Sequence, residues 1–265
     1  MYTNAAGLLS IISYVAATLL LANEIFATKP HRASIYTAWV GTGLHGFYTA
    51  LNVQNHGGFD FSFFSSASLS ALVISLLLLF AALDKPVSKL GVLIFPIAAA
   101  MLMLDATYSS TPHPLANTNW QMSTHVLTSI LAFSLLNIAA LQAVLLAIQD
   151  QQLRHHHPKR LMLALPPLQA MESLLFQIIA TGLVFLTISL ISGFVFIEDL
   201  FAQHLVHKTV LSILAWIIFS GLLFGRLRYG WRGQSAIQWT LIGFTLLLLA
   251  YFGSKLVLEL ILKKV

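Results

Sequence analysis

The chain has 265 residues, of which 58% are hydrophobic and only 9% are charged, and its mean hydropathy is +0.83. This composition is far from that of a soluble domain and indicates a protein embedded in a lipid bilayer. The formal charge is +5, but the basic residues are dispersed in short loops, so we expect no nucleic-acid partner. With no cysteine, the chain has no disulfide, no thiolate metal site and no thiol relay of its own.

About eight apolar stretches follow one another, each about 18 to 25 residues long and therefore long enough to cross a bilayer as a helix. We predict an all-α fold, a polytopic membrane helical bundle with about eight transmembrane helices. Residues 1–265 are expected to form a single integral membrane domain. The predicted spans are, in chain order, 6–26, 34–53, 63–83, 90–108, 124–148, 174–197, 209–227 and 237–261.

Most of the 14 lysines and arginines lie in the connections after the first, third, fifth and seventh spans. Because positive charge is retained in the cytoplasm during insertion, these connections are predicted to be cytoplasmic and both termini external. The residues concerned are Lys29, Arg32, Lys85, Lys89, Arg154, Lys159, Arg160, Arg226, Arg228 and Arg232.

His45 is the polar residue placed most deeply in a predicted span. It lies about 11 residues into the second span, roughly 16 Å along a helix, and hence near the bilayer midplane. An unpaired polar group in hydrocarbon costs several kcal/mol, so this side chain needs a partner, a ligand or a water path. A functional role and an interhelical hydrogen bond to Ser, Thr or Tyr are equally compatible with the sequence.

His125 and His207 begin the fifth and seventh spans and are predicted to lie at one level on the external face. Two imidazoles from different helices at one level are suited to ligate a single haem iron from opposite sides. The alternative, which spacing alone favours, is that each histidine caps a helix or snorkels at the interface.

A small and polar face follows His125, with Thr128, Ser129 and Ala132 at helical spacing. A bulky ligand or a neighbouring helix would be able to approach this face closely. The preceding external segment, residues 109–123, is uncharged and contains aromatic side chains that suit either a porphyrin face or anchoring at the interface.

Two acidic residues lie in apolar surroundings. Asp105, near the outer end of the fourth span, is a candidate to orient an external histidine through a hydrogen bond. Glu24, near the inner end of the first span, is expected to pair with Lys29 or Arg32. The three consecutive histidines at 155–157 lack fixed ligand geometry, and we interpret them as part of the basic cytoplasmic loop.

Several short sequence words stand in the last third of the chain. They are the run from Leu186 to Gly193, His207-Lys208, Leu214-Ala215-Trp216, Arg226-Leu227-Arg228, Gly230-Trp231-Arg232-Gly233, Gly243-Phe244 and Tyr251-Phe252-Gly253. In these words the chain resembles the cytochrome c assembly membrane proteins of the CcsA and HemX type. The eight-span layout, with His125 opening the fifth span, is most similar to the YpjD-like inner-membrane branch, over a core of about 34–262.

The resemblance implies haem handling at the outer membrane face, where external histidines flank a tryptophan-rich loop that presents haem to apocytochrome. His125 matches the first external histidine of that pattern. The chain departs from it in residues 198–208, which lack the tryptophan-rich signature, in 256–262, which lack the final external histidine, and at Phe224, where a membrane histidine is often found.

The preferred hypothesis is therefore a haem-binding or haem-handling accessory protein of cytochrome c biogenesis that performs no chemistry itself. Its cofactor would be haem b, with His125 and His207 as the iron ligands and His45 as an inner station. Its expected partners are haem, apocytochrome c and other cytochrome assembly proteins in a bacterial inner membrane. One alternative is a HemX-like regulator of haem biosynthesis without bound haem. The other is a membrane ion-homeostasis or transport protein, for which His45 and Asp105 are the only supporting residues.

Overall fold

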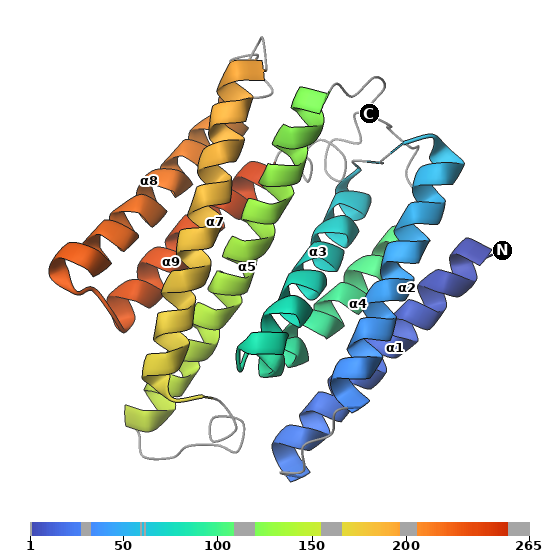
Figure 1. Cartoon of the computed structure of the whole chain (residues 1–265), viewed down its shortest axis with the longest axis horizontal. Helices are drawn as coiled ribbons and strands as arrows, with labels where there is room; N and C mark the ends of the chain where they lie inside the picture. The colour runs from blue at the N-terminus through green and yellow to red at the C-terminus, as the bar shows by residue number, and fades with distance from the viewer. Residues whose placement is uncertain are drawn as a thin grey trace. The chain divides into compact units, whose positions relative to one another are not determined.

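The computed structural model describes residues 2–27, 33–58, 60, 62–108, 120–154, 166–196 and 206–253. Nearly all of them are helical, which confirms the predicted all-α fold. The elements are α1 (Tyr2–Ala27), α2 (Ala33–His56), α3 (Phe63–Asp84), the 3-10 turn η1 (Ser88–Leu90), α4 (Gly91–Thr107), α5 (Trp120–Arg154), α7 (Leu168–Phe196), α8 (Val206–Tyr229), α9 (Gln234–Leu248) and the π-helical turn η2 (Leu249–Gly253) (Figure 1).

Each predicted span coincides with a helix. Seven helices are long and apolar enough to cross a bilayer when η1 is counted with α4 and η2 with α9. The remaining helix, α2, matches the predicted span 34–53 and is less apolar because Gly, Thr, His and Asn interrupt it. The chain is therefore a multi-pass membrane protein. The predicted span 237–261 is helical as far as Gly253, and its last residues lie outside the described part.

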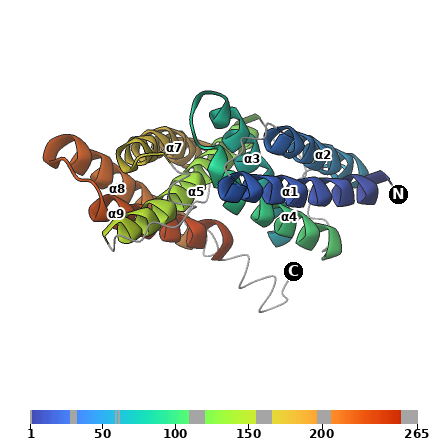
Figure 2. The same ribbon diagram turned by 90° about the horizontal axis from the view of Figure 1, so that it is seen from below.

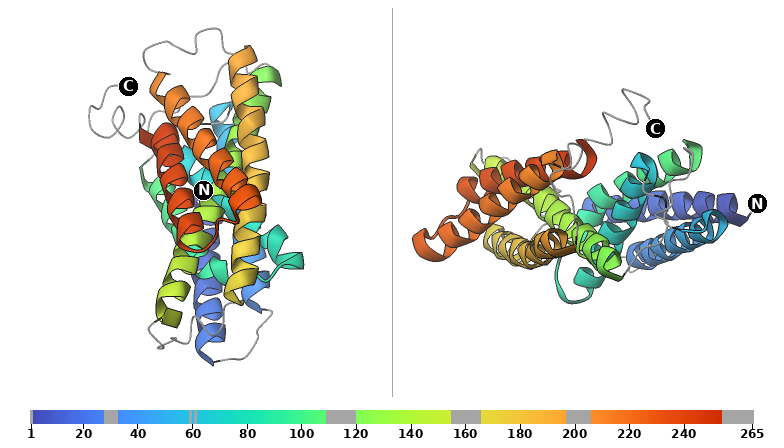
Figure 3. Two further views of the ribbon diagram at one scale, coloured as in Figure 1. Left: turned by 90° about the vertical axis from the view of Figure 1, so that its left-hand side faces the viewer. Right: turned by 90° about the horizontal axis from the view of Figure 1, so that it is seen from above.

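The contacts divide the helices into two compact units, the first formed by α1 to α4 and the second by α5 to η2. In the first unit, α1 lies between α2 and α4, and α3 packs against α4 and α2 (Figure 2). In the second, α5 and α7 form an extended antiparallel pair, α8 lies beside α7, and α9 packs against both α8 and α5 (Figure 3). The prediction of a single membrane domain stays a prediction.

The helix α5 is 35 residues long, about 50 Å at 1.5 Å per residue, and exceeds the roughly 30 Å hydrocarbon core of a bilayer. It packs against α7, where small residues face it at Gly182 and Ser189. A Cβ built on Gly182 would lie 2.9 Å from Leu136 of α5. The absence of a side chain at Gly182 therefore allows the two backbones to approach closely.

The turn between α8 and α9 is built around Trp231. Gly230 and Gly233, on either side of it, have φ angles of 67° and 59°, which L-residues with side chains rarely adopt. The indole ring lies against the backbone of Gly225 in α8, where a Cβ would overlap it, and stacks on Trp239 of α9 with ring centroids 5.8 Å apart. The ring thus fills the corner between the two helices.

Replacing Gly225 with alanine is expected to destabilise the second unit. The added methyl group would overlap the rigid indole of Trp231, and such overpacking costs about 1–3 kcal/mol. Thermal unfolding of the detergent-purified variant should show a lower midpoint than the wild type. The matched control is Gly221→Ala, one turn earlier in α8, where a Cβ meets nothing within 4 Å and the midpoint should stay or rise. Equal midpoints for the two variants would contradict this role of Trp231.

Polar side chains tie the helices together at the end of the second unit where α8 ends. Arg226 Nη1 lies 2.9 Å from Glu172 Oε1 of α7 and donates a 3.2 Å hydrogen bond to the carbonyl of Trp231. Its guanidinium also lies over the ring of Phe176, 4.7 Å from the centroid. One arginine thus joins α7, α8 and the turn before α9.

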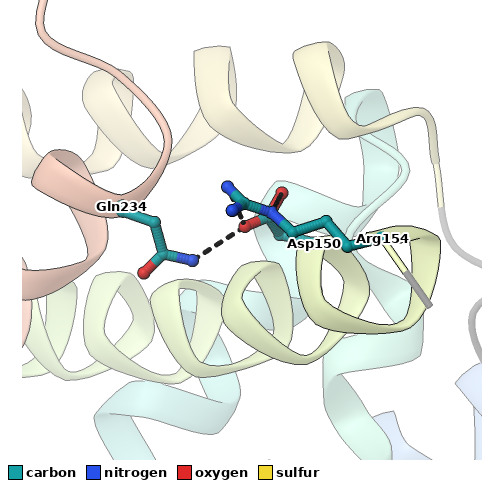
Figure 4. Close-up of polar contacts among 3 residues, drawn as sticks. All are labelled: Asp150, Arg154 and Gln234. Atoms are coloured by element: carbon teal, nitrogen blue, oxygen red, sulfur yellow. Dashed lines mark hydrogen bonds and ion pairs between the residues drawn. The ribbon is translucent and has the colours of Figure 1, made fainter.

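A second polar tie joins α5 to α9. Asp150 accepts a 2.7 Å hydrogen bond from the amide of Gln234, at the start of α9, and forms a 3.1 Å ion pair with Arg154 one turn later in α5 (Figure 4). The side chain of Arg154 is 67% exposed, whereas that of Arg226 is 35% exposed and that of Glu172 only 9%. The Glu172–Arg226 pair is therefore the better shielded of the two.

Arg226→Ala is expected to lower the free energy of unfolding by about 2 kcal/mol, because it removes charge-assisted hydrogen bonds and leaves the Glu172 carboxylate unpaired. Arg154→Ala breaks an exposed pair within one helix and should cost no more than about 0.5 kcal/mol. Equilibrium unfolding of both variants in mixed detergent micelles measures the difference. If Arg154→Ala were as destabilising as Arg226→Ala, burial would not determine the strength of these pairs.

Candidate functional site

His125, in the second turn of α5, has its imidazole fixed by α7. Its Nδ1 lies 3.0 Å from the carbonyl oxygen of Ser189 and 3.2 Å from the hydroxyl of Ser192. Since a carbonyl oxygen only accepts hydrogen bonds, the contact with Ser189 is a hydrogen bond in the tautomer that carries its proton on Nδ1. In that tautomer the neutral ring has its lone pair on Nε2. A backbone carbonyl on the other ring nitrogen is the usual way in which proteins orient a metal-binding histidine.

Small residues make room for this ring. A Cβ built on Gly193 would lie 3.1 Å from Cε1 of His125, so the glycine leaves just enough space for the imidazole. Ser129 donates a 2.6 Å hydrogen bond to the His125 carbonyl and also contacts the Ser189 hydroxyl. The small, polar face that the sequence places after His125 is thus occupied by the neighbouring helix α7, one of the two occupants considered for it.

The π-helical turn η2 packs an aromatic side chain against α5. Tyr251 stacks on Phe133 of α5, with ring centroids 4.8 Å apart. At the end of the helices, Trp120 lies 5.8 Å from Phe196 between ring centroids. Helical turns of this wide type are frequent at functional sites. The contacts of His125 therefore come from α5 and α7, and η2 packs on α5 about two turns further along.

His207 is the second residue of α8, and its side chain is exposed. Successive helices of the second unit alternate in direction, so α5 and α8 begin at the same end of this unit (Figure 3). This arrangement agrees with the prediction that His125 and His207 lie at one level. Joint ligation of one iron by these two residues stays a prediction.

His45, in α2 of the first unit, is fully buried, and both of its ring nitrogens are engaged. Nε2 lies 3.0 Å from the hydroxyl of Ser68, and Nδ1 lies 3.3 Å from the hydroxyl of Tyr14. The Tyr14 hydroxyl is also 3.3 Å from Thr42. This geometry matches the interhelical hydrogen bond to Ser, Thr or Tyr that the sequence allows. Among the described residues, Nε2 of His125 has no such partner.

The two acidic residues singled out in the sequence also have partners. Asp105 accepts a 2.6 Å hydrogen bond from Ser65 and lies in the first unit, together with His45 rather than His125. Glu24 forms a 3.5 Å ion pair with Lys89. Its predicted partners, Lys29 and Arg32, lie outside the described residues, as do the histidines at 155–157 and most of segments 109–123 and 198–208.

The residues that hold His125 were not recognised as site residues from the sequence. Ser189, Ser192 and Gly193 belong to the run at 186–193, which was noted only as a word of the family. Their signal in the sequence is that small residues recur three and four positions apart on one helix face. This pattern is typical of close helix packing in membranes. The spacing does not reveal which facing residue they contact, so it gives no link to His125.

Comparison with known proteins agrees with the resemblance. The sequence model of the family described as "Cytochrome C assembly protein" matches residues 29–262. Inner membrane protein YpjD of Escherichia coli strain K12 is 29% identical, over 96% of this chain and 98% of the relative. The cytochrome c biogenesis proteins CcsA of Chlamydomonas reinhardtii and Guillardia theta are 28% and 25% identical, over 55% and 63% of this chain and 40% and 61% of theirs. No solved structure matches the chain.

His45→Leu is expected to destabilise the first unit, because it removes two hydrogen bonds from a buried network and a buried polar group left unpaired costs about 1–3 kcal/mol. His45→Gln keeps a donor and an acceptor and should be milder. Thermal unfolding midpoints in detergent measure both variants. The control is His56→Leu, at the exposed end of the same helix. A leucine variant at position 45 as stable as the wild type would contradict a packing role for this histidine.

Proposed function

Because this chain belongs to the cytochrome c assembly protein family, we propose that it is a haem-handling accessory protein of cytochrome c biogenesis. Family membership rests on the match over residues 29–262. Relatives are named for cytochrome c biogenesis and for the inner membrane, and both names fit a multi-pass chain. The natural location of the protein is accordingly the bacterial inner membrane.

The observation that supports haem binding most directly is the 3.0 Å contact between Nδ1 of His125 and the Ser189 carbonyl. A haem iron needs a neutral imidazole with a free lone pair and a fixed ring plane. The Ser189 carbonyl supplies the first condition by holding the proton on Nδ1, and the Gly193 backbone beside the ring restricts its orientation. Nε2 of His125 is thus suited to bind a haem iron.

His207 is the proposed second ligand, since it is exposed, lies in the same unit and begins a helix at the same end as α5. Haem b would then be held by two nitrogen donors. His45 is the weaker candidate, because binding iron there would require breaking its hydrogen bond to Ser68 or to Tyr14. An inner station at His45 would therefore need a rearrangement of α1, α2 and α3.

The chain's own residues support binding and orientation of haem rather than its covalent attachment. When bound, haem would supply a redox-active iron. The cytochrome thiols that receive haem must come from the apocytochrome, since the chain has no cysteine to reduce or hold them. Apocytochrome c and other assembly proteins are therefore the proposed partners of the end where α5 and α8 begin.

The test is the visible absorption spectrum of detergent-purified protein, oxidised and reduced, as isolated and after addition of haem. The wild type should show a Soret band that is lost or shifted in His125→Ala and, separately, in His207→Ala. His56→Ala, which alters an exposed histidine of the first unit, should leave the spectrum unchanged. A wild type that stays colourless after haem is supplied would contradict haem handling and favour the regulatory alternative, which needs no bound haem.

A finer prediction concerns Gly193. Its replacement by alanine places a methyl group 3.1 Å from Cε1 of His125, which is tighter than ordinary contact, so the ring must move or turn. We expect a shifted reduced spectrum or about a tenfold weaker haem affinity, corresponding to roughly 1.4 kcal/mol. Gly221→Ala, in open space, should behave as the wild type. An unaltered spectrum and affinity in Gly193→Ala would show that the orientation of His125 is not what binds haem.

A further inference from the structure

The end of the second unit at which α5 and α8 end carries unpaired positive charge. Arg154 (Figure 4) and Arg226 lie there, and each pairs with an acidic residue of α5 or α7. Arg228, in the last turn of α8, and Arg232, in the turn before α9, are exposed. Their guanidinium groups form no ion pair or hydrogen bond within the described part of the chain. Two positive charges at this end therefore have no described counter-charge.

The turn that carries these two arginines has a fixed geometry. Their charge is predicted to help orient the chain during insertion, but that role needs no defined backbone position. The backbone N–H groups of Gly230 and Trp231 each donate a 3.2 Å hydrogen bond to a carbonyl in the last two turns of α8. The indole of Trp231 fills the corner between α8 and α9. The backbone positions of Arg228 and Arg232 are therefore fixed relative to each other.

The turn lies at the depth of the lipid headgroups. The helix α8 has 24 residues, about 36 Å along its axis, and is longer than the roughly 30 Å hydrocarbon core. Its last turn therefore extends beyond the core. Tyr229, at the end of α8, and Trp239 of α9 have exposed rings, and such aromatic side chains are typical of the boundary between hydrocarbon and headgroups. The arginines beside them are at the level of the lipid phosphates.

An apolar surface of α8 adjoins the arginines on the membrane side. Phe224 precedes Arg228 by one turn on the same helix face, and its side chain is 60% exposed. Leu227, next to Arg228, is 87% exposed. Further into the membrane, Gly221 leaves the helix backbone uncovered, since a Cβ there would meet no atom within 4 Å. A positively charged group at headgroup depth is thus continuous with an apolar surface.

We propose that Arg228 and Arg232 together bind the headgroup phosphate of an anionic phospholipid, whose acyl chains lie along Phe224 and Gly221 of α8. A guanidinium group binds a phosphate through two parallel hydrogen bonds. Two cations without a counter-charge favour a lipid of net negative charge over one whose headgroup also contains a cation. The site lies at the end of the unit opposite to His125 and does not depend on haem handling.

Native mass spectrometry of the full chain in detergent tests the proposal, with phosphatidylglycerol and phosphatidylcholine of identical acyl chains as the two probes. The wild type should bind phosphatidylglycerol roughly tenfold more tightly, the order expected for two arginines at an anionic headgroup. The double variant Arg228→Gln/Arg232→Gln should bind the two lipids with affinities within about twofold of each other. Its unfolding midpoint without lipid should equal that of the wild type, because neither side chain loses a partner.

Two controls separate a binding site from an effect of net charge. Lys263→Gln/Lys264→Gln removes the same charge from the end of the chain, and Arg154→Gln removes a nearby arginine that already pairs with an acid. Both should keep the preference for phosphatidylglycerol. A wild type without this preference, or a preference that survives in Arg228→Gln/Arg232→Gln, would overturn the proposal. So would an equal loss in the lysine variant, which would assign the effect to net charge.

Inorganic phosphate distinguishes a lipid site from a site for a soluble anion. Added in excess at constant ionic strength, it should leave bound phosphatidylglycerol in place, because it does not contact the apolar surface formed by Phe224 and Leu227. Displacement of the lipid by inorganic phosphate would overturn lipid binding in favour of a soluble anion.

Discussion

The absence of water from the bilayer core is the constraint on which the rest of this structure depends. Backbone groups in hydrocarbon must be satisfied within the protein, which is why the described spans are helices. The same constraint applies to side chains. Within the first unit, His45 is bonded to α1 and α3, and within the second, Arg226 is bonded to Glu172 of α7. Polar residues in each unit therefore act as cross-links between helices. A polar atom without such a partner among the described residues, such as Nε2 of His125, becomes a candidate for ligand binding.

Span positions were predictable from the sequence because each apolar run has the length that a bilayer demands. The prediction succeeded even for α2, whose glycines and threonines lower its apolarity, because its length was still appropriate. The partners of polar side chains were not predictable in the same way. Nothing in the sequence indicates that Ser65 lies between Asp60 and Asp105, or that Glu24 contacts Lys89, since these contacts depend on the rotation of each helix about its axis. The candidate histidines were therefore found from the sequence, but their environments were not.

The sequence words that carry the family resemblance have a common physical role in the second unit. The run at 186–193 holds His125, Trp216 donates a 2.9 Å hydrogen bond to Thr187 across α8 and α7, and a Cβ on Gly243 would lie 3.0 Å from the ring of Phe219. These words thus specify how α5, α7, α8 and α9 pack. The same packing places the Ser189 carbonyl beside Nδ1 of His125.

The tryptophan in the corner between α8 and α9 has a mechanical consequence. His207 lies at one end of α8 and Trp231 follows the other, about 36 Å away along 24 residues. If the indole acts as a wedge that sets the angle between the helices, a change of about five degrees at the wedge moves the far end of α8 by about 3 Å. The helix is then a lever, and a substitution at the turn would alter the spacing of the two histidines without contacting either of them.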